Sequence, residues 1–123
     1  MTPKSAVATT GDIRRWATAL PEVEESSHFI FDAPVFKVRG RSFLGISRGE
    51  RTVVFLISER DANQAQEADP DSCRAVRRQD ARRSFLGLEV VLEAVSKKRI
   101  EALVEQAWLE RAPKRLAKSR RPG

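Results

Sequence analysis

Three clusters of basic residues are the main candidates for a functional site in this sequence, and the function that basic side chains support is anion binding. Arginine dominates the first two clusters, and its planar guanidinium group matches phosphate oxygens and guanine edges. The clusters are Lys37, Arg39, Arg41, Arg48 and Arg51; then Arg74, Arg77, Arg78, Arg82 and Arg83; and the C-terminal segment from Arg111. Because 33% of the chain is charged, some clustering is expected without any function. Polyanion binding and a merely solvated surface both stay open.

Catalytic and metal sites have weaker support. The chain has one histidine, His28, and one cysteine, Cys73, and it lacks G-x-S-x-G, P-loop and dinucleotide-binding motifs. Zinc needs several His or Cys ligands, and the acids between Glu22 and Asp32 lack the loop spacing of a calcium site. We therefore predict no catalytic residue, no metal and no cofactor. For Cys73 two interpretations stay open, a thiol activated by neighbouring arginines or an incidental free thiol.

The position of the net charge matters more than its size. The formal charge is +6, from 23 bases and 17 acids. Residues 111–121 hold six bases and no acid, so the rest of the chain is formally neutral. At 123 residues the chain suits one domain. No apolar run is long enough for a membrane span, and no secretory signal or disulfide is expected. A cytoplasmic protein is the simplest interpretation.

Apolar spacing and turn residues predict three helices and five strands. One helix follows Thr9 or Thr10 as a cap and ends at Pro21. A second spans 59–68 with a poor apolar face, and a third, after Ser96, has the strongest apolar stripe. Strands are predicted at 26–30, 34–38, 41–46, 52–57 and 85–95. The arginine-rich segment 72–83 is interpreted as irregular.

The stretch PVFKVRGRSFLGI, residues 34–46, is interpreted as a hairpin with Gly40 in its turn. Phe36, Val38 and Phe43 are expected to point inward. Strand alternation then places the nearby cations at the tip or on the opposite face, exposed to solvent.

These elements predict an α+β fold with a mostly antiparallel sheet of about five strands and the N- and C-terminal helices packed on one face. We expect a disordered N-terminus over 1–9, a single domain over 10–116 and a basic C-terminal tail over 117–123.

Several stretches resemble the MmcQ/YjbR family of small bacterial proteins. ALPEVEESSH resembles the family's connector after the first helix, and PVFKVRGRSFLGI resembles its hairpin. EADPDS resembles its acidic-proline turn, and EQAWLERAPKRL, residues 105–116, resembles its closing motif. The likeness covers roughly residues 11–117. The sequence departs from the pattern where Phe85 replaces a frequent Trp and where arginine-rich 74–83 replaces an apolar segment.

The resemblance implies a frataxin/CyaY-like fold, no enzymatic activity, and DNA binding of the double-wing type, in which β-hairpins approach the duplex. It places Lys37, Arg39 and Arg41 in a wing and Lys114 and Arg115 in the closing motif. With the arginine-rich segment, the expected DNA contacts are Lys37, Arg39, Arg41, Arg77, Arg78, Arg82, Arg83, Lys114 and Arg115, mainly to phosphates. The alternative is a protein-interaction module that receives a partner on the sheet face or on a free strand edge.

Overall fold

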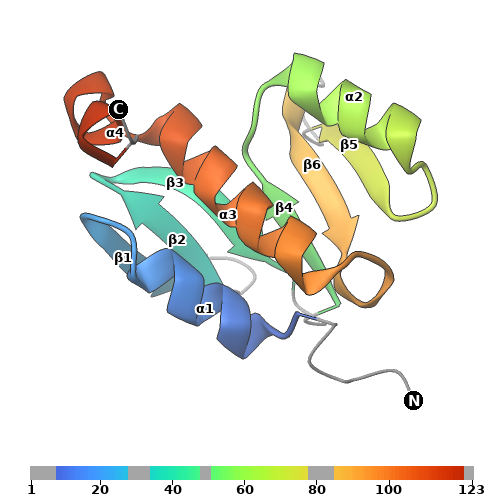
Figure 1. Cartoon of the computed structure of the whole chain (residues 1–123), viewed down its shortest axis with the longest axis horizontal. Coiled ribbons are helices and arrows are strands. Elements are labelled where there is room, and N and C mark those ends of the chain that lie inside the picture. Colours follow the sequence, from blue (N-terminus) through green and yellow to red (C-terminus); the bar gives the residue numbers. More distant parts are fainter. Residues whose placement is uncertain (1–7, 28–33, 48–50, 78–84, 121–123) are drawn as a thin grey trace.

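The computed structural model describes residues 8–27, 34–47, 51–77 and 85–120. Within these residues the chain forms six strands, four α-helices and one short 3-10 helix (Figure 1). The helices are α1 (Thr10–Thr18), α2 (Glu59–Ala68), η2 (Leu92–Ala94), α3 (Lys97–Arg111) and α4 (Lys114–Arg120). The strands are β1 (Val23–Ser27), β2 (Pro34–Val38), β3 (Arg41–Ile46), β4 (Thr52–Phe55), β5 (Cys73–Arg77) and β6 (Phe85–Val91).

The six strands form one sheet in the order β1-β2-β3-β4-β6-β5, and every neighbouring pair is antiparallel. The predicted α+β class with an antiparallel sheet is confirmed, with six strands where about five were expected. Between β2 and β3 the register shifts after Phe36, so that Phe43 is the extra residue of a bulge. This explains why Phe43 and Leu44, neighbours in the chain, are both fully buried.

The additional strand, β5, lies in the segment that the sequence analysis interpreted as irregular. That interpretation is wrong for residues 73–77, which pair with β6 along their whole length. The apolar signal was weak because Cys73, Ala75 and Val76 are small and stand among arginines. Since β5 is an edge strand, Arg74 and Arg77 remain exposed while Cys73 is buried.

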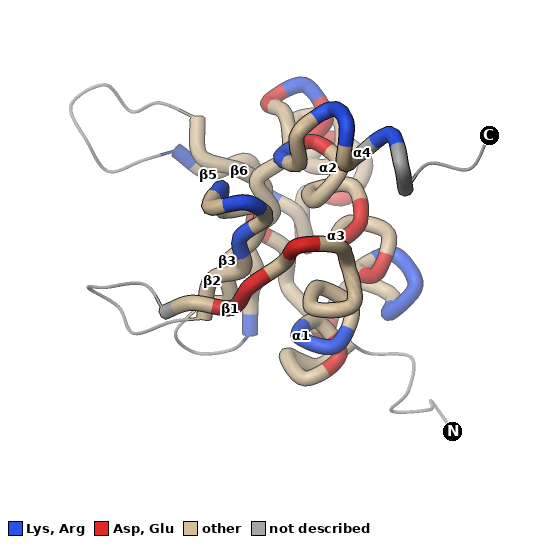
Figure 2. The backbone as a smooth tube through the Cα atoms, turned by 90° about the vertical axis from the view of Figure 1, so that its left-hand side faces the viewer, with Lys and Arg blue, Asp and Glu red and all other residues tan. Residues whose placement is uncertain are grey.

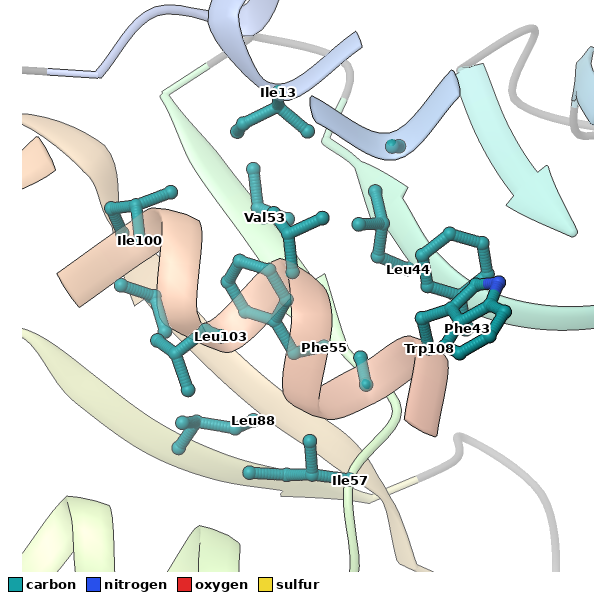
Figure 3. Packing of buried hydrophobic residues seen from close by; sticks show 14 of the residues in the cluster. Ile13, Phe43, Leu44, Val53, Phe55, Ile57, Leu88, Ile100, Leu103 and Trp108 are labelled. Atoms are coloured by element: carbon teal, nitrogen blue, oxygen red, sulfur yellow. The ribbon is translucent and has the colours of Figure 1, made fainter. Parts of the chain in front are cut away.

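The described helices lie on one side of the sheet (Figures 1 and 2). This confirms the predicted packing of the N- and C-terminal helices on one face. Helix α3 crosses the middle of this side, α1 packs against it, and α2 lies against β5 and β6. The side chains between these layers form the core, and Figure 3 shows part of it. The largest fully buried side chains include Trp108, Phe36, Phe43, Phe55, Ile13 and Leu103.

The other side of the sheet, here called the open face, carries no described helix (Figure 2). The strand register identifies one row of residues that crosses all six strands on this face. The row is Ser26, Val35, Gly45, Val54, Glu89 and Arg74. The open face is therefore a mixture of small, apolar and charged side chains.

The predicted boundaries of the strands differ from the observed ones at three places. The first strand was predicted at 26–30, but β1 is Val23–Ser27, and residues 28–30 lie outside the described part. The fourth ends at Phe55 instead of residue 57. The last ends at Val91, after which Leu92–Ala94 turn into η2.

The described structure includes a few residues of the segments predicted to be the disordered N-terminus and the basic tail. Within the segment 1–9, Ala8 is buried and Thr9 forms a capping box with Asp12 at the start of α1. Near the other end, α4 continues to Arg120, inside the expected tail over 117–123. The domain limits of 10–116 stay a prediction. None of the described helices combines the length and apolar character of a membrane-spanning segment.

Gly87 on the open face tests how closely β6 approaches β4. A Cβ at Gly87 would lie 2.5 Å from the carbonyl oxygen of Phe55 and 3.1 Å from Cγ1 of Val54. We expect Gly87→Ala to lower the free energy of unfolding by about 1–3 kcal/mol, the range for overpacked sites. Urea unfolding followed by tryptophan fluorescence measures this.

Gly45 provides the matched control, since it also lies in a strand on the open face. A Cβ there would meet nothing closer than Cγ2 of Val35 at 3.8 Å, which is ordinary contact. Gly45→Ala should change the unfolding free energy by well under about 1 kcal/mol. Equal losses for the two variants would contradict the close approach at Gly87.

Candidate nucleic-acid interface

The β2–β3 hairpin is closed by a two-residue turn, Arg39-Gly40. Both residues have positive φ, 51° and 80°, as a type I′ turn requires. Phe36, Val38 and Phe43 are fully buried, so the predicted inward residues and the turn at Gly40 are confirmed. The hairpin is thus anchored in the core by these side chains, and its tip has the backbone conformation of a type I′ turn.

The three cations of this hairpin point in different directions. Lys37 lies on the open face, directly opposite Glu24 of β1, and is half-buried. Arg39 occupies the turn itself. Arg41 is the direct partner of the buried Val38, so it points toward the helix-covered side, where it is exposed. The hairpin therefore does not present its cations as a single basic finger.

Arg39 is held by a carboxylate. Its Nε and Nη2 donate to the two oxygens of Glu22 at 2.7 and 2.9 Å, which is the bidentate geometry. These hydrogen bonds hold the pKa of Glu22 below its ordinary value and raise the pKa of Arg39. Both side chains are about half exposed, at 55% and 46%. A phosphate approaching Arg39 must therefore compete with Glu22.

The second basic cluster contributes one described cation among the predicted contacts. Arg77, the last residue of β5, is exposed and forms an ion pair with Glu59 at 2.6 Å. Arg78, Arg82 and Arg83 lie outside the described residues. The DNA contacts predicted for this segment, Arg77 included, therefore stay predictions.

The C-terminal cluster is helical. Lys114, Arg115 and Lys118 of α4 are exposed, and Leu116 packs on the core. Among the described residues, none of these three cations forms an ion pair. The sequence analysis placed Lys118 in the basic C-terminal segment, which was expected to assist DNA binding as a tail, but did not name it among the individual contacts. The signal was present, because Pro113 favours a helix start and helical spacing i, i+4 separates Lys114 from Lys118.

The strand register brings these clusters to one end of the sheet. β3 and β4 are antiparallel, so the start of β3 lies toward the end of β4, where Leu44 is the partner of Phe55. β4 and β6 are antiparallel as well, so the end of β4 lies toward the start of β6, where Phe55 pairs with Leu88. β5 ends beside the start of β6, where Arg77 pairs with Phe85. The hairpin tip and the end of β5 therefore lie at the same end of the sheet, measured along the strands.

Helix α3 reaches this end of the sheet with its last turn. Nε of Arg111 donates to the carbonyl oxygen of Leu56, just beyond β4, at 3.2 Å. The amide of Ser58, which caps α2, donates to Glu110 at 3.0 Å. Helix α4 continues outward from there (Figure 1). We call this region the basic end and define it by Arg39, Arg41, Arg77, Lys114, Arg115 and Lys118.

The open face is electrically balanced, in contrast. Lys37 stands opposite Glu24, and Arg74 forms an ion pair with Glu89 at 2.8 Å. Each of these two positive charges thus has a negative charge beside it on the neighbouring strand. At these positions the open face has no excess of positive charge. Of the predicted contacts, Lys37 is therefore the one that the structure separates from the others.

Cys73 is not placed as a reactive thiol. It is buried, and burial together with the nearby charge of Asp69 raises the pKa of the thiol, against a smaller opposite effect of Arg99. A raised pKa keeps the sulfur protonated near neutral pH, which makes it a poor nucleophile. The interpretation as an incidental free thiol is the one that the structure favours.

The acidic connector takes part in ion pairs. Glu22 binds Arg39, and Glu25 binds Arg14 of α1 at 2.8 Å, while Asp32 lies outside the described residues. In the described part of the chain, no group of three or more His, Cys, Asp or Glu residues could hold a metal ion. His28 also lies outside the described residues.

A sequence model of the YjbR family matches residues 18–110, which is most of the chain. The chain belongs to the YjbR family. A search of curated proteins finds no match. Among solved structures, the crystal structure of the Deinococcus radiodurans protein DR2400, a DUF419-domain protein, is similar with a TM-score of 0.72. At 18% identity the alignment covers 96% of this chain and 91% of that one, which supports the fold alone.

Proposed function

We propose that this YjbR-family protein is a non-enzymatic, cytoplasmic DNA-binding protein that contacts phosphates through its basic end. One observation carries the proposal: three basic segments, far apart in the sequence, lie at one end of the sheet. Four of the cations there, Arg41, Lys114, Arg115 and Lys118, are exposed and have no ion pair to another described residue. Such cations gain free energy when they replace the counterions of a duplex.

The dimensions of the basic end suit a duplex. β3 and β5 are separated by three strand spacings, about 14 Å at ~4.8 Å each. The major groove is ~12 Å wide, so cations on β3 and β5 can face phosphates on its two sides. Helix α4 adds cations on the helix-covered side, where Arg41 also points.

The proposal is limited to phosphate contacts. Base readout requires side chains fixed in one orientation by neighbouring bonds, and Arg41, Lys114 and Arg115 are exposed cations without such partners among the described residues. Arg39 is fixed, but its bidentate face is occupied by Glu22. Binding should therefore depend strongly on salt and weakly on sequence.

A charge-neutral triple variant tests the proposal. Arg41→Gln, Lys114→Gln and Arg115→Gln together remove three phosphate contacts, so the slope of log K against log salt should become shallower by about 0.9 for each contact. Fluorescence anisotropy with a labelled duplex, from low to moderate salt, measures the slope. The matched control is Arg51→Gln, Lys98→Gln and Arg99→Gln, which removes the same charge from exposed residues at the opposite end.

The control variant should keep most of the slope. If both triple variants lose affinity equally, binding follows net charge and not the basic end. If the unchanged protein shows no salt-dependent binding at all, the proposal fails.

Removing the competing carboxylate should strengthen binding. Glu22→Gln frees the guanidinium of Arg39 for phosphate, and we expect affinity to rise roughly two- to fivefold, in line with the modest strength of exposed ion pairs. Glu25→Gln is the matched control, because it removes the same charge from the same strand region but breaks an ion pair with Arg14 of α1 and not with Arg39. Equal gains in the two variants would point to general charge, and no gain in Glu22→Gln would exclude a contact through Arg39.

A further inference from the structure

The two edges of the sheet differ in how they are protected. At the β5 edge, the backbone amide of Ala75 donates to Oε1 of Gln66 in α2 at 2.7 Å, and α2 packs along this strand. A side chain thus occupies a backbone position that another strand would need. At the other edge, no described segment lies beyond β1, which crosses the front of the molecule in Figure 2. Only β1 therefore offers a free edge within the described structure.

The ladder between β1 and β2 shows which backbone groups of β1 point outward. The amide of Arg39 donates to the carbonyl oxygen of Glu22. In an antiparallel pair, bonded positions recur at every second residue. The backbone groups of Glu24 therefore point toward β2, while those of Val23 and Glu25 point to the free edge. These outward groups are the template for an added strand.

The side chains of β1 indicate which kind of added strand this edge can bind. Glu24 is exposed on the open face and has no ion pair to another described residue. On the helix side, Val23 is half-buried and the carboxylate of Glu25 is bonded to Arg14. On the open face, an added strand therefore meets the carboxylate of Glu24, which has Lys37 of β2 as its neighbour on the other side. On the helix side it meets a mainly neutral, partly apolar surface.

A second copy of β1 does not fit this edge. An antiparallel pairing centred on Glu24 or Glu25 would place the same glutamate of the two copies face to face, and like charges on facing strands are destabilising. The β5 edge of another copy carries arginines, but Gln66 already bonds its backbone. The edge is therefore suited to a different chain.

We propose that the free edge of β1 binds an extended segment of another protein, with Lys or Arg on one face and apolar residues on the other. The segment adds a seventh, antiparallel strand to the sheet. Its backbone bonds to Val23 and Glu25 supply affinity, and a basic side chain beside Glu24 supplies selectivity. This function is separate from DNA binding, because it uses the acidic strand and not the basic end.

The probe is the synthetic peptide acetyl-Thr-Lys-Val-Lys-Val-Lys-Thr-amide, titrated into the full chain labelled with nitrogen-15. We expect amide shifts concentrated on β1 and slower hydrogen exchange at Val23 and Glu25. N-methylation of the two valines removes the donors that face β1 and should weaken binding at least about tenfold. N-methylation of the first two lysines removes amides that point away and should leave the affinity nearly unchanged. These peptide comparisons use the unchanged protein.

Two further comparisons test the charge and the edge. A peptide with Glu in place of Lys should bind at least about tenfold more weakly, because it opposes Glu24. Glu25→Pro removes the outward amide and keeps the ladder to β2, as prolines on edge strands do, so it should abolish peptide binding. Glu25→Gln controls for the lost charge and should bind the peptide.

The proposal is overturned if the Lys peptide does not bind, if both N-methylated peptides bind equally, or if shifts appear away from β1. It is also overturned if sedimentation shows a dimer that Glu25→Pro dissociates, because the occupant would then be a second copy. Duplex binding by Glu25→Pro should equal that of Glu25→Gln, so failure at this edge is distinguishable from failure at the basic end.

Discussion

The burial of Trp108 is the constraint on which the basic end depends. Its side chain is fully buried and is part of the core shown in Figure 3. Its indole Nε1–H donates to the carbonyl oxygen of Pro21 at 3.1 Å. One residue near the end of α3 therefore ties the segment after α1 to the last turns of α3, which also contacts β3. Arg111, three residues later, then bonds to Leu56, and this fixes where α4 begins.

Ion pairing decides how much of the positive charge at this end is available. Arg39 and Arg77 each have a carboxylate partner, Glu22 and Glu59, which offset their charge in the absence of a ligand. The exposed cations of α4 have no such partner in the described structure. A chain whose body is formally neutral can thus still present a local positive surface. The net charge by itself would not have located it.

Much of the fold was predictable because its signals are local. The alternation of Phe36 and Val38, followed by Gly40, indicated the hairpin, and the apolar stripe after Ser96 indicated α3. β5 was missed because its small apolar residues alternate with arginines, and its place depends on partners elsewhere: Glu89 for Arg74 and Gln66 for Ala75.

The candidate site was less predictable, because it depends on which distant residues meet. Arg39 and Glu22 are 17 residues apart in sequence, and no periodicity relates them. The opposite directions of Lys37 and Arg41 follow from the two-residue turn and its register, which Gly40 alone does not specify. The helical form of α4 was signalled by Pro113. Its position at the end of the sheet follows from the tertiary contacts of Trp108 and Arg111.

Backbone amide mapping by NMR tests the central claim most directly. A short duplex of arbitrary sequence is titrated at low salt into the full chain labelled with nitrogen-15. The account predicts that the largest shift changes fall on Arg39–Arg41 and on Lys114–Lys118, and that they diminish as salt is added. Changes that centre on the open face or on β1, or a complete absence of changes at low salt, would contradict it.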